Sequence, residues 1–199
     1  MAKVVTIFDS YATLATAFSD AGYEVQAAIL SNDDEREFYR EKFENRVFVF
    51  SEDIRSMCTC GVRHRNPHGI VVKLPDTVYE QESYLYSQKE LIEQVMRFVR
   101  DAKPNFILVE LKKDFLEDPD KFKYLTDKVG DAGYDCFVLL HGHKSFLLAF
   151  NQEKNLVETF DFPEIKAEDK VTKEYLVSFA QRIAEKLIEE EAPQEEQQQ

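Results

Sequence analysis

Short apolar runs of strand length alternate with longer stretches of helical spacing, and this alternation most constrains how the chain can fold. Runs of strand length are expected at 3–8, 24–29, 47–50, 70–72, 105–110, 136–140 and 146–150. Helices are expected over about 14–22, 84–101 and 175–187, where apolar residues recur at helical spacing, over about 33–43, where acidic residues come first, and over about 119–132. Strands that alternate with helices predict an α/β fold with a mixed, mostly parallel sheet and helices on both faces.

Two local patterns refine this prediction. The run 105–110, NFILVE, is almost continuously apolar, which is typical of a strand buried on both faces. The runs 136–140 and 146–150 are close enough in the chain to pair as an antiparallel hairpin around HGHK. In such sheets, ligands bind beyond the carboxyl ends of the strands, so functional residues are expected there.

The organisation predicted for the chain is a single domain over residues 1–190, followed by a tail. The tail, residues 191–199, is low in complexity and rich in Glu and Gln, which favours an acidic, disordered end. The sequence shows no internal repeat and no sign of a second domain.

Acidic residues outnumber basic ones by 38 to 25, which gives a formal net charge of −13. This excess argues against general DNA binding, which needs a basic face. No window of about 18 uncharged apolar residues occurs, so no membrane association is expected. The N-terminus does not resemble a signal peptide. With only three cysteines, no disulfide framework is expected, and the predicted localisation is cytoplasmic or otherwise intracellular.

The best metal-like cluster is formed by Cys58, Cys60, His64 and His68. These residue types are ligands that zinc prefers. However, the C-x-C spacing is tighter than usual and all four fall within one short loop. The prediction is therefore no metal site, with a structural zinc site as the weaker alternative. Arginines in the same loop leave a phosphate or partner contact open, although a solvated loop is favoured.

Several segments resemble the cytosine-5 DNA methyltransferases, in the order in which that family carries them. IFDSYATLATAFSDAGYEVQAA resembles the first strand, turn, helix and second strand of the family. NRVFVFSEDI resembles its third strand, and KPNFILVE resembles the strand that carries its ENV motif. FLLAFNQEKNLVETFDFPE and VSFAQRIAEKLIEE resemble its last strand pair and its final helix. The resemblance covers residues 3–190 and implies a Rossmann-like methyltransferase fold.

The resemblance also implies a site for S-adenosylmethionine, of which this sequence keeps little. The family binds this cofactor with a glycine-rich turn, where Ser10, Ala12 and Thr13 stand here. Leu30 stands where the family has an acidic residue for the ribose hydroxyls. Asp53, which matches the residue that contacts the adenine amino group, is retained. We therefore expect this site to be degenerate and the protein to have no cofactor.

The catalytic residues that the resemblance implies are also altered. Pro75 is followed by Asp76, where the family has its nucleophilic cysteine, and a carboxylate is a poor substitute for a thiolate. Glu110 matches the glutamate that holds the cytosine ring, so it is a residual catalytic residue. The arginine-containing loop that orients this glutamate is missing. The target-recognition domain is reduced to a short segment, so nothing is left to flip out a base.

Three functions follow from these observations. The preferred prediction is that the protein is not an enzyme but a protein-binding, assembly or regulatory subunit, with a protein partner or larger assembly, because folds outlast the sites built on them. The first alternative is a residual S-adenosylmethionine-dependent methyltransferase that needs a partner subunit. The second is an acidic decoy that occupies a DNA-binding or restriction-modification protein.

Overall fold

The computed structural model describes residues 1–30, 33–75, 78–81, 84–141, 144–154, 157–165 and 170–191. The tail predicted at 191–199 lies almost wholly outside these residues. No helix in the described part of the chain is long and apolar enough to cross a membrane.

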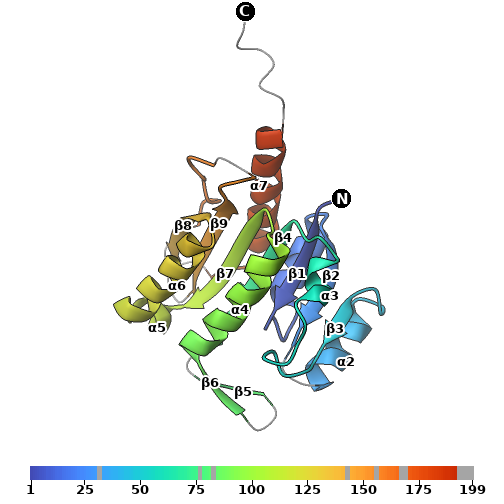
Figure 1. The fold of residues 1–199 in the computed structure, drawn as a ribbon. Coiled ribbons are helices and arrows are strands. Elements are labelled where there is room, and N and C mark those ends of the chain that lie inside the picture. Colours follow the sequence, from blue (N-terminus) through green and yellow to red (C-terminus); the bar gives the residue numbers. More distant parts are fainter. Residues whose placement is uncertain are drawn as a thin grey trace, which may run out of the picture.

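A seven-stranded sheet forms the centre of the molecule (Figure 1). Its strand order is β3-β2-β1-β4-β7-β9-β8. The strands are β1 (Lys3–Ile7), β2 (Glu24–Ile29), β3 (Phe48–Phe50), β4 (Gly69–Lys73), β7 (Phe106–Lys112), β8 (Tyr134–His141) and β9 (Lys144–Asn151). The first five are parallel, whereas β9 pairs antiparallel with both β7 and β8. The predicted α/β fold with a mixed, mostly parallel sheet is confirmed.

Helices cover both faces of this sheet. They are α1 (Thr13–Asp20), α2 (Asp33–Lys42), α3 (Cys60–Arg63), α4 (Gln88–Ala102), α5 (Lys113–Leu116), α6 (Pro119–Asp131) and α7 (Lys173–Glu191). One hydrophobic core lies between the sheet and α4 and α6, which cross in front of the strands in Figure 1. The other lies between the sheet and α1, α2 and α7. We call the second side the α1/α7 face.

A two-stranded hairpin projects from the carboxyl edge of the sheet, at the bottom of Figure 1. It consists of β5 (Val78–Gln81) and β6 (Tyr84–Ser87), which the sequence analysis did not predict. The helix expected from residue 84 therefore begins only at Gln88. Ser87 ends the hairpin and caps α4, because its hydroxyl accepts the Glu90 amide at 3.3 Å while Glu90 accepts the Ser87 amide at 2.7 Å.

Candidate functional site

Four charged side chains lie where β1, β4, β7 and β9 meet the carboxyl edge of the sheet. They are Asp9 just after β1, Lys73 at the end of β4, Glu110 in β7 and Lys144 at the start of β9. We call this set the carboxyl-edge cluster. In β4 and β7, the residues two positions before Lys73 and Glu110 pack on the α1/α7 face. Because residues two apart in a strand point to the same face of the sheet, the side chains of Lys73 and Glu110 also emerge on the α1/α7 face.

Glu110 is a buried carboxylate of which only one oxygen has a partner among the described residues. The residue is 3% exposed. Its Oε1 lies 3.0 Å from the Lys144 ammonium, and its Oε2 has no hydrogen-bond partner among the described residues. A buried charge needs a partner, so the free oxygen points to a group that the protein itself does not supply.

Lys144 takes the place of an orienting group that the sequence analysis considered missing. The sequence has no arginine-containing loop to hold Glu110. The structure shows that the lysine of HGHKSF does this from β9, where Lys144 lies two residues along the strand from the register partner of Glu110. In the sequence, Lys144 lies in the HGHK turn, before the strand expected at 146–150, so no local pattern linked it to Glu110.

Lys73 lies directly beside Glu110, because the two residues are register partners across β4 and β7. Its charge acts on Asp9, whose pKa it lowers against the larger opposing effect of burial. Lys73 nevertheless forms no ion pair with any residue that the structure describes. Within the carboxyl-edge cluster, the Lys73 ammonium and Oε2 of Glu110 are therefore the two groups without a partner among the described residues.

Asp9 closes the turn between β1 and α1. It is fully buried, and its carboxylate accepts the amides of Thr13 at 3.0 Å and Ala15 at 2.9 Å. The Tyr39 hydroxyl of α2 donates to the Asp9 carbonyl at 2.8 Å. Burial raises the pKa of Asp9, although the amide of Ala15 opposes this shift. The N-terminal amides of α1, which attract anions, are thus bound to a side chain of the protein.

The turn that replaces the glycine-rich loop keeps a left-handed backbone without glycine. Phe8 has φ of 62° and Ala12 has φ of 51°, a region that costs a non-glycine residue roughly 1 kcal/mol or more. Ala12 is buried, whereas Ser10 and Thr13 are half-buried. The turn therefore bends sharply enough to begin α1, although each of its residues carries a Cβ.

The other residues matched to the cofactor site lie at the ends of β2 and β3. Leu30 is fully buried, and its amide donates to the Phe50 carbonyl at 2.8 Å. Asp53 is 7% exposed, and both of its oxygens lie 3.1 Å from Nε of Arg55. Asp53 is therefore held in place, with its carboxylate against a guanidinium.

The segment matched to the catalytic Pro-Cys is described only in part. The Pro75 carbonyl accepts a hydrogen bond from the side chain of buried Gln88 at 3.2 Å, which ties the end of β4 to α4. Asp76, predicted at the position of the nucleophile, lies outside the described residues.

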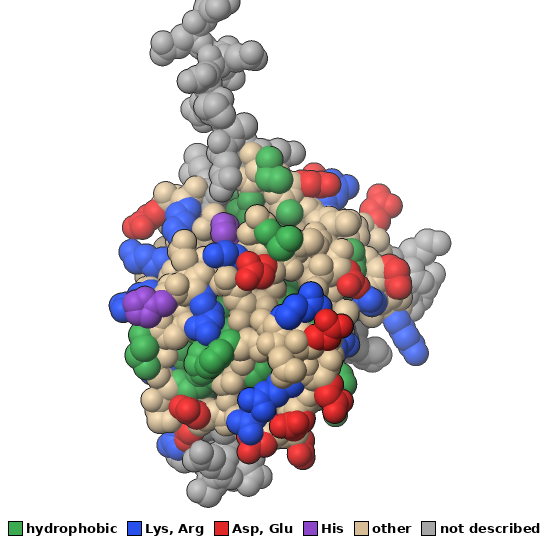
Figure 2. All heavy atoms as spheres, turned by 90° about the vertical axis from the view of Figure 1, so that its right-hand side faces the viewer, with side chains coloured by type: hydrophobic (Ala, Val, Ile, Leu, Met, Phe, Trp, Pro, Cys, Tyr) green, Lys and Arg blue, Asp and Glu red, His purple; other side chains and the backbone are tan. Residues whose placement is uncertain are grey.

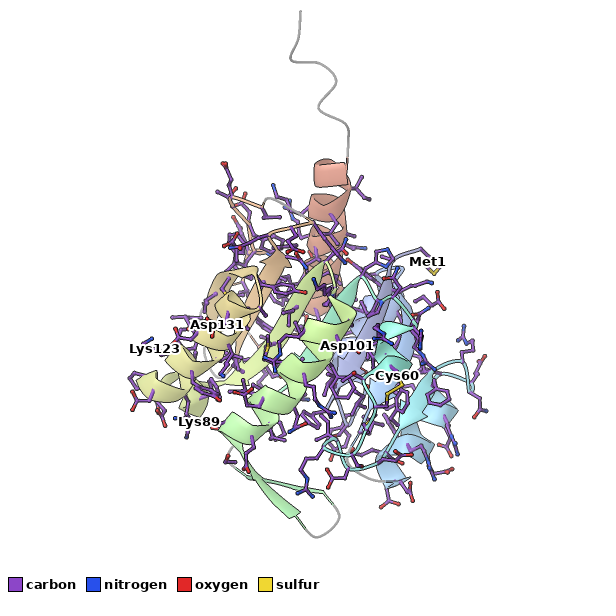
Figure 3. The ribbon with its side chains drawn as sticks, in the orientation of Figure 1. Met1, Cys60, Lys89, Asp101, Lys123 and Asp131 are labelled. Atoms are coloured by element: carbon purple, nitrogen blue, oxygen red, sulfur yellow. A yellow bond between two sulfur atoms is a disulfide. The ribbon has the colours of Figure 1, made fainter. Side chains whose placement is uncertain are left out.

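The structure does not bring the Cys/His loop together as a metal site. Cys58 and Cys60 form a disulfide, drawn in yellow beside α3 in Figure 3, although three cysteines predicted no disulfide framework. His68 Nδ1 accepts the Lys3 amide at 3.1 Å, and His64 follows α3. In the ranges that the structure describes, no group of three or more His, Cys, Asp or Glu residues is placed to hold a metal ion.

The arginines of the same loop bind neighbouring parts of the protein. Arg63 lies 3.3 Å from Asp101 of α4, labelled in Figure 3, and Thr59 donates to the same carboxylate at 2.6 Å. Arg65 lies over the rings of Phe48 and Phe50. These contacts join the loop that carries Asp53 to α4 and β3.

Solved structures of methyltransferases resemble this fold. Residues covering 81% of the chain match 52% of a DNMT2 mutant from Spodoptera frugiperda, with 13% identity and a TM-score of 0.65. Dnmt2 methyltransferase from S. pombe matches with 13% identity and a TM-score of 0.61, over 75% of this chain and 49% of that one. The methyltransferase domain of bacterial CtHen1 matches with 9% identity and a TM-score of 0.54, over 74% of this chain and 89% of that one.

The sequence itself matches no protein-family model and no curated protein. The chain spans about half the length of the two DNMT2 structures: the matched regions cover 52% and 49% of those chains. At this level of identity the matches show the fold alone.

Two expectations from the sequence are overturned by these matches. The substituted turn and the missing Pro-Cys predicted that the protein is not an enzyme and that it has no cofactor. Both predictions are contradicted at the level of the fold, because the structures that it resembles are methyltransferases. In its fold, the chain is a methyltransferase-like protein similar to DNMT2.

Proposed function

We propose that this protein is an S-adenosylmethionine-dependent methyltransferase whose active site is completed by a partner subunit. One observation carries the proposal: within a methyltransferase-like fold, the carboxyl edge holds a buried glutamate, Glu110, with one oxygen fixed by Lys144 and the other free. Ligands of α/β proteins bind at the carboxyl ends of parallel strands, and a buried oxygen without a hydrogen-bond partner is unusual in a folded core.

The residues at this edge fit the cofactor in part. Lys73 and Glu110 offer a cation and an acceptor with free hydrogen-bonding capacity, and Asp53 lies after β3. The amides of Thr13 and Ala15 are bound to Asp9. When bound, S-adenosylmethionine would supply an electrophilic methyl group on its sulfonium sulfur. The protein's own residues would bind and orient it, and Glu110 would hold a proton donor on its free oxygen.

A partner subunit is proposed because the segment before α7 is short. The family resemblance places target recognition between Glu164 and Lys173. A cavity of about 700 Å³ lies beside this segment, lined in part by Pro163, Ile165, Tyr175 and Ser178. The Tyr175 hydroxyl is buried there and has no hydrogen-bond partner among the described residues. A second chain that inserts a hydrogen-bonding group at this cavity would satisfy it.

The charge of the chain bears on what that partner contributes. The net charge is −13, and Figure 2 shows acidic and basic side chains interspersed on the side of α2 and β3 rather than a basic surface. Contacts to a nucleic-acid backbone would need such a surface. We infer that, if the substrate is a nucleic acid, the partner supplies the basic contacts.

Calorimetric titration of S-adenosylhomocysteine into the full chain tests the cofactor part of the proposal. We expect one-to-one binding and a raised melting temperature, because a ligand that binds only the folded state stabilises it. No heat and no thermal shift at millimolar ligand would overturn the proposal.

A second experiment tests the need for a partner. Transfer of a radiolabelled methyl group is compared between the chain alone and the chain isolated with its natural partner, with Glu110→Gln as the control. Equal transfer by the chain alone would contradict the need for a partner.

A further inference from the structure

We propose that Cys58 and Cys60 form a reversible thiol–disulfide exchange site whose reaction partner is a low-molecular-weight thiol of the glutathione type. The inference is independent of the proposed methyl transfer, because it rests on the loop between β3 and β4 and not on the carboxyl-edge cluster. The sequence pointed to these two cysteines only as candidate zinc ligands, and the structure pairs them as a disulfide instead.

The disulfide joins two residues that are already close in the chain. Only Thr59 separates Cys58 from Cys60, and their Cα atoms lie 5.2 Å apart. A disulfide stabilises a fold mainly by restricting the unfolded chain, and this effect is smallest for the shortest loops. The bond therefore contributes little to holding the fold together, which favours a chemical role over a structural one.

Solvent reaches the pair from the surface of the protein. Cys58 is exposed and Cys60 is half-buried, in the loop that leads into α3 (Figure 3). Exposed disulfides are the ones that exchange with external thiols, because the attacking sulfur needs access to the bond. The third cysteine, Cys136 of β8, differs in chemistry: burial raises the pKa of its thiol to about 11, which keeps it protonated and unreactive.

The loop around the pair is anchored by contacts that do not involve sulfur. Before the pair, the Arg97 guanidinium of α4 donates to the Met57 carbonyl at 2.9 Å. Between the two cysteines, the Thr59 hydroxyl donates to the Asp101 carboxylate of α4 at 2.6 Å. After the pair, the side chain of Val62 is buried in the core. Because these contacts hold the backbone on both sides, the two thiols remain neighbours after reduction and the bond can form again.

Exchange begins at Cys58, the more exposed sulfur. The thiolate of the small molecule bonds to Sγ of Cys58 while the protein disulfide breaks, and Cys60 leaves as a thiolate that takes a proton from solvent. A second small-molecule thiolate attacks the small molecule's sulfur in this mixed disulfide and releases Cys58. In total, the protein disulfide gains two electrons and two protons, and two small thiols are oxidised to one disulfide.

The reverse reaction also favours Cys58. The amide of Cys60 donates to Sγ of Cys58 at 3.2 Å. A hydrogen bond of this kind stabilises a thiolate, which is the form of cysteine that attacks a disulfide. When the pair is reduced, Cys58 is therefore the sulfur that reacts with an oxidised small molecule, and Cys60 then resolves the mixed disulfide.

Glutathione buffers test the site in the folded, full chain. The protein is equilibrated at several ratios of reduced to oxidised glutathione and quenched with acid, and its thiols are then alkylated in denaturant and counted by mass spectrometry. We expect the number of free thiols to rise reversibly from one to three as the ratio increases, with an unchanged near-ultraviolet circular dichroism spectrum. Cys136→Ser is the matched control and should pass from no free thiol to two over the same ratios.

Single substitutions test which sulfur reacts. Oxidised glutathione should modify Cys58 in Cys60→Ser roughly tenfold faster than it modifies Cys60 in Cys58→Ser, because exposure and the amide hydrogen bond favour the Cys58 thiolate. Equal rates, or faster modification of Cys60, would overturn the assignment of Cys58 as the reacting sulfur.

Three results of the wild-type titration would overturn the exchange site itself. A native protein that keeps one free thiol at every ratio, and shows three only when it is unfolded in the presence of reductant, has a structural disulfide. Loss of the near-ultraviolet spectrum on reduction would show that the two states do not share one fold. Three free thiols in excess oxidised glutathione would show that the cysteines do not pair. This titration needs no substitution, so it decides the matter even if a variant fails to fold.

Discussion

Lys73 and Glu110 face each other across two parallel strands, yet Glu110 forms its ion pair with Lys144 of β9 instead. The antiparallel strand β9 brings Lys144 to within 3.0 Å of Oε1, and Lys73 stays unpaired within the described part of the chain. This arrangement leaves one cation, and one buried carboxylate oxygen, without a partner among the described residues at the edge where ligands of α/β proteins bind.

The Glu110–Lys144 pair is expected to matter for stability because Glu110 is buried. Lys144→Met would leave the carboxylate without its cation and should lower the free energy of unfolding by about 1–3 kcal/mol, less than for a fully buried pair because the Lys144 side chain is 36% exposed. Urea unfolding measures the change. The control, Lys123→Met, removes an exposed pair with Asp127 and should cost less than about 0.5 kcal/mol. Equal losses in both variants would contradict the prediction.

Burial of Asp9 predicts a defined pH dependence. Its pKa is raised in the folded state, chiefly by burial, so the folded protein binds this proton more tightly than the unfolded chain. The stability that Asp9 contributes is therefore greatest below its unfolded pKa, about 3.9, and declines as the pH rises toward the folded value. We compare the unfolding free energies of wild type and Asp9→Asn. The advantage of wild type over the variant should decrease as the pH increases from about 4. A difference that stays constant across pH 4–8 would show that Asp9 titrates normally.

The Tyr39 hydroxyl joins α2 to the turn that begins α1. Its hydrogen bond to the Asp9 carbonyl, 2.8 Å long, is buried, so Tyr39→Phe should lower the unfolding free energy by about 1–2 kcal/mol. Tyr11 is 73% exposed, and Tyr11→Phe is the matched control, with no measurable change expected. Chemical denaturation of both variants measures the difference. A Tyr39→Phe protein as stable as wild type would show that the bond contributes nothing.

The cysteines predict a distinctive thiol titration. Burial raises the pKa of Cys136 to about 11, and Asp135 adds to the shift. At pH 8 the native thiol should react with a disulfide reagent roughly a hundredfold more slowly than the same thiol in urea, because only the thiolate reacts. Cys136→Ser should abolish this reaction.

Because Cys58 and Cys60 form a disulfide, unfolded, unreduced protein should show one thiol; three thiols without reductant would contradict that pairing.

Local patterning predicted most of the sheet. The strand expected at 24–29 has the bounds of β2, and that expected at 105–110 overlaps β7, which extends to Lys112. The hairpin expected at 136–150 forms with longer strands, from Tyr134 to His141 and from Lys144 to Asn151. These elements were predictable because their periodicity reflects burial on the faces of one sheet.

The hairpin β5–β6 and the helices α3 and α5 were not predictable in this way. Tyr84–Ser87 joins onto the apolar stripe of α4, so its sequence continues a helical pattern even though the chain forms a strand there. The four-residue helices are too short to show any periodicity. In the site, Tyr39 and Lys144 were missed because each contributes through a contact distant in the chain.

The sequence by itself determined the α/β class, the positions of the main strands and the resemblance to a methyltransferase fold. Its substituted motifs also predicted that the protein is no enzyme and has no cofactor, and the methyltransferase-like fold contradicts this prediction. Only the tertiary structure decided that Lys73, Glu110 and Lys144 meet at one edge. The reason is physical: neighbouring charges on different strands are set by strand order and register, which depend on packing of the whole sheet rather than on local spacing.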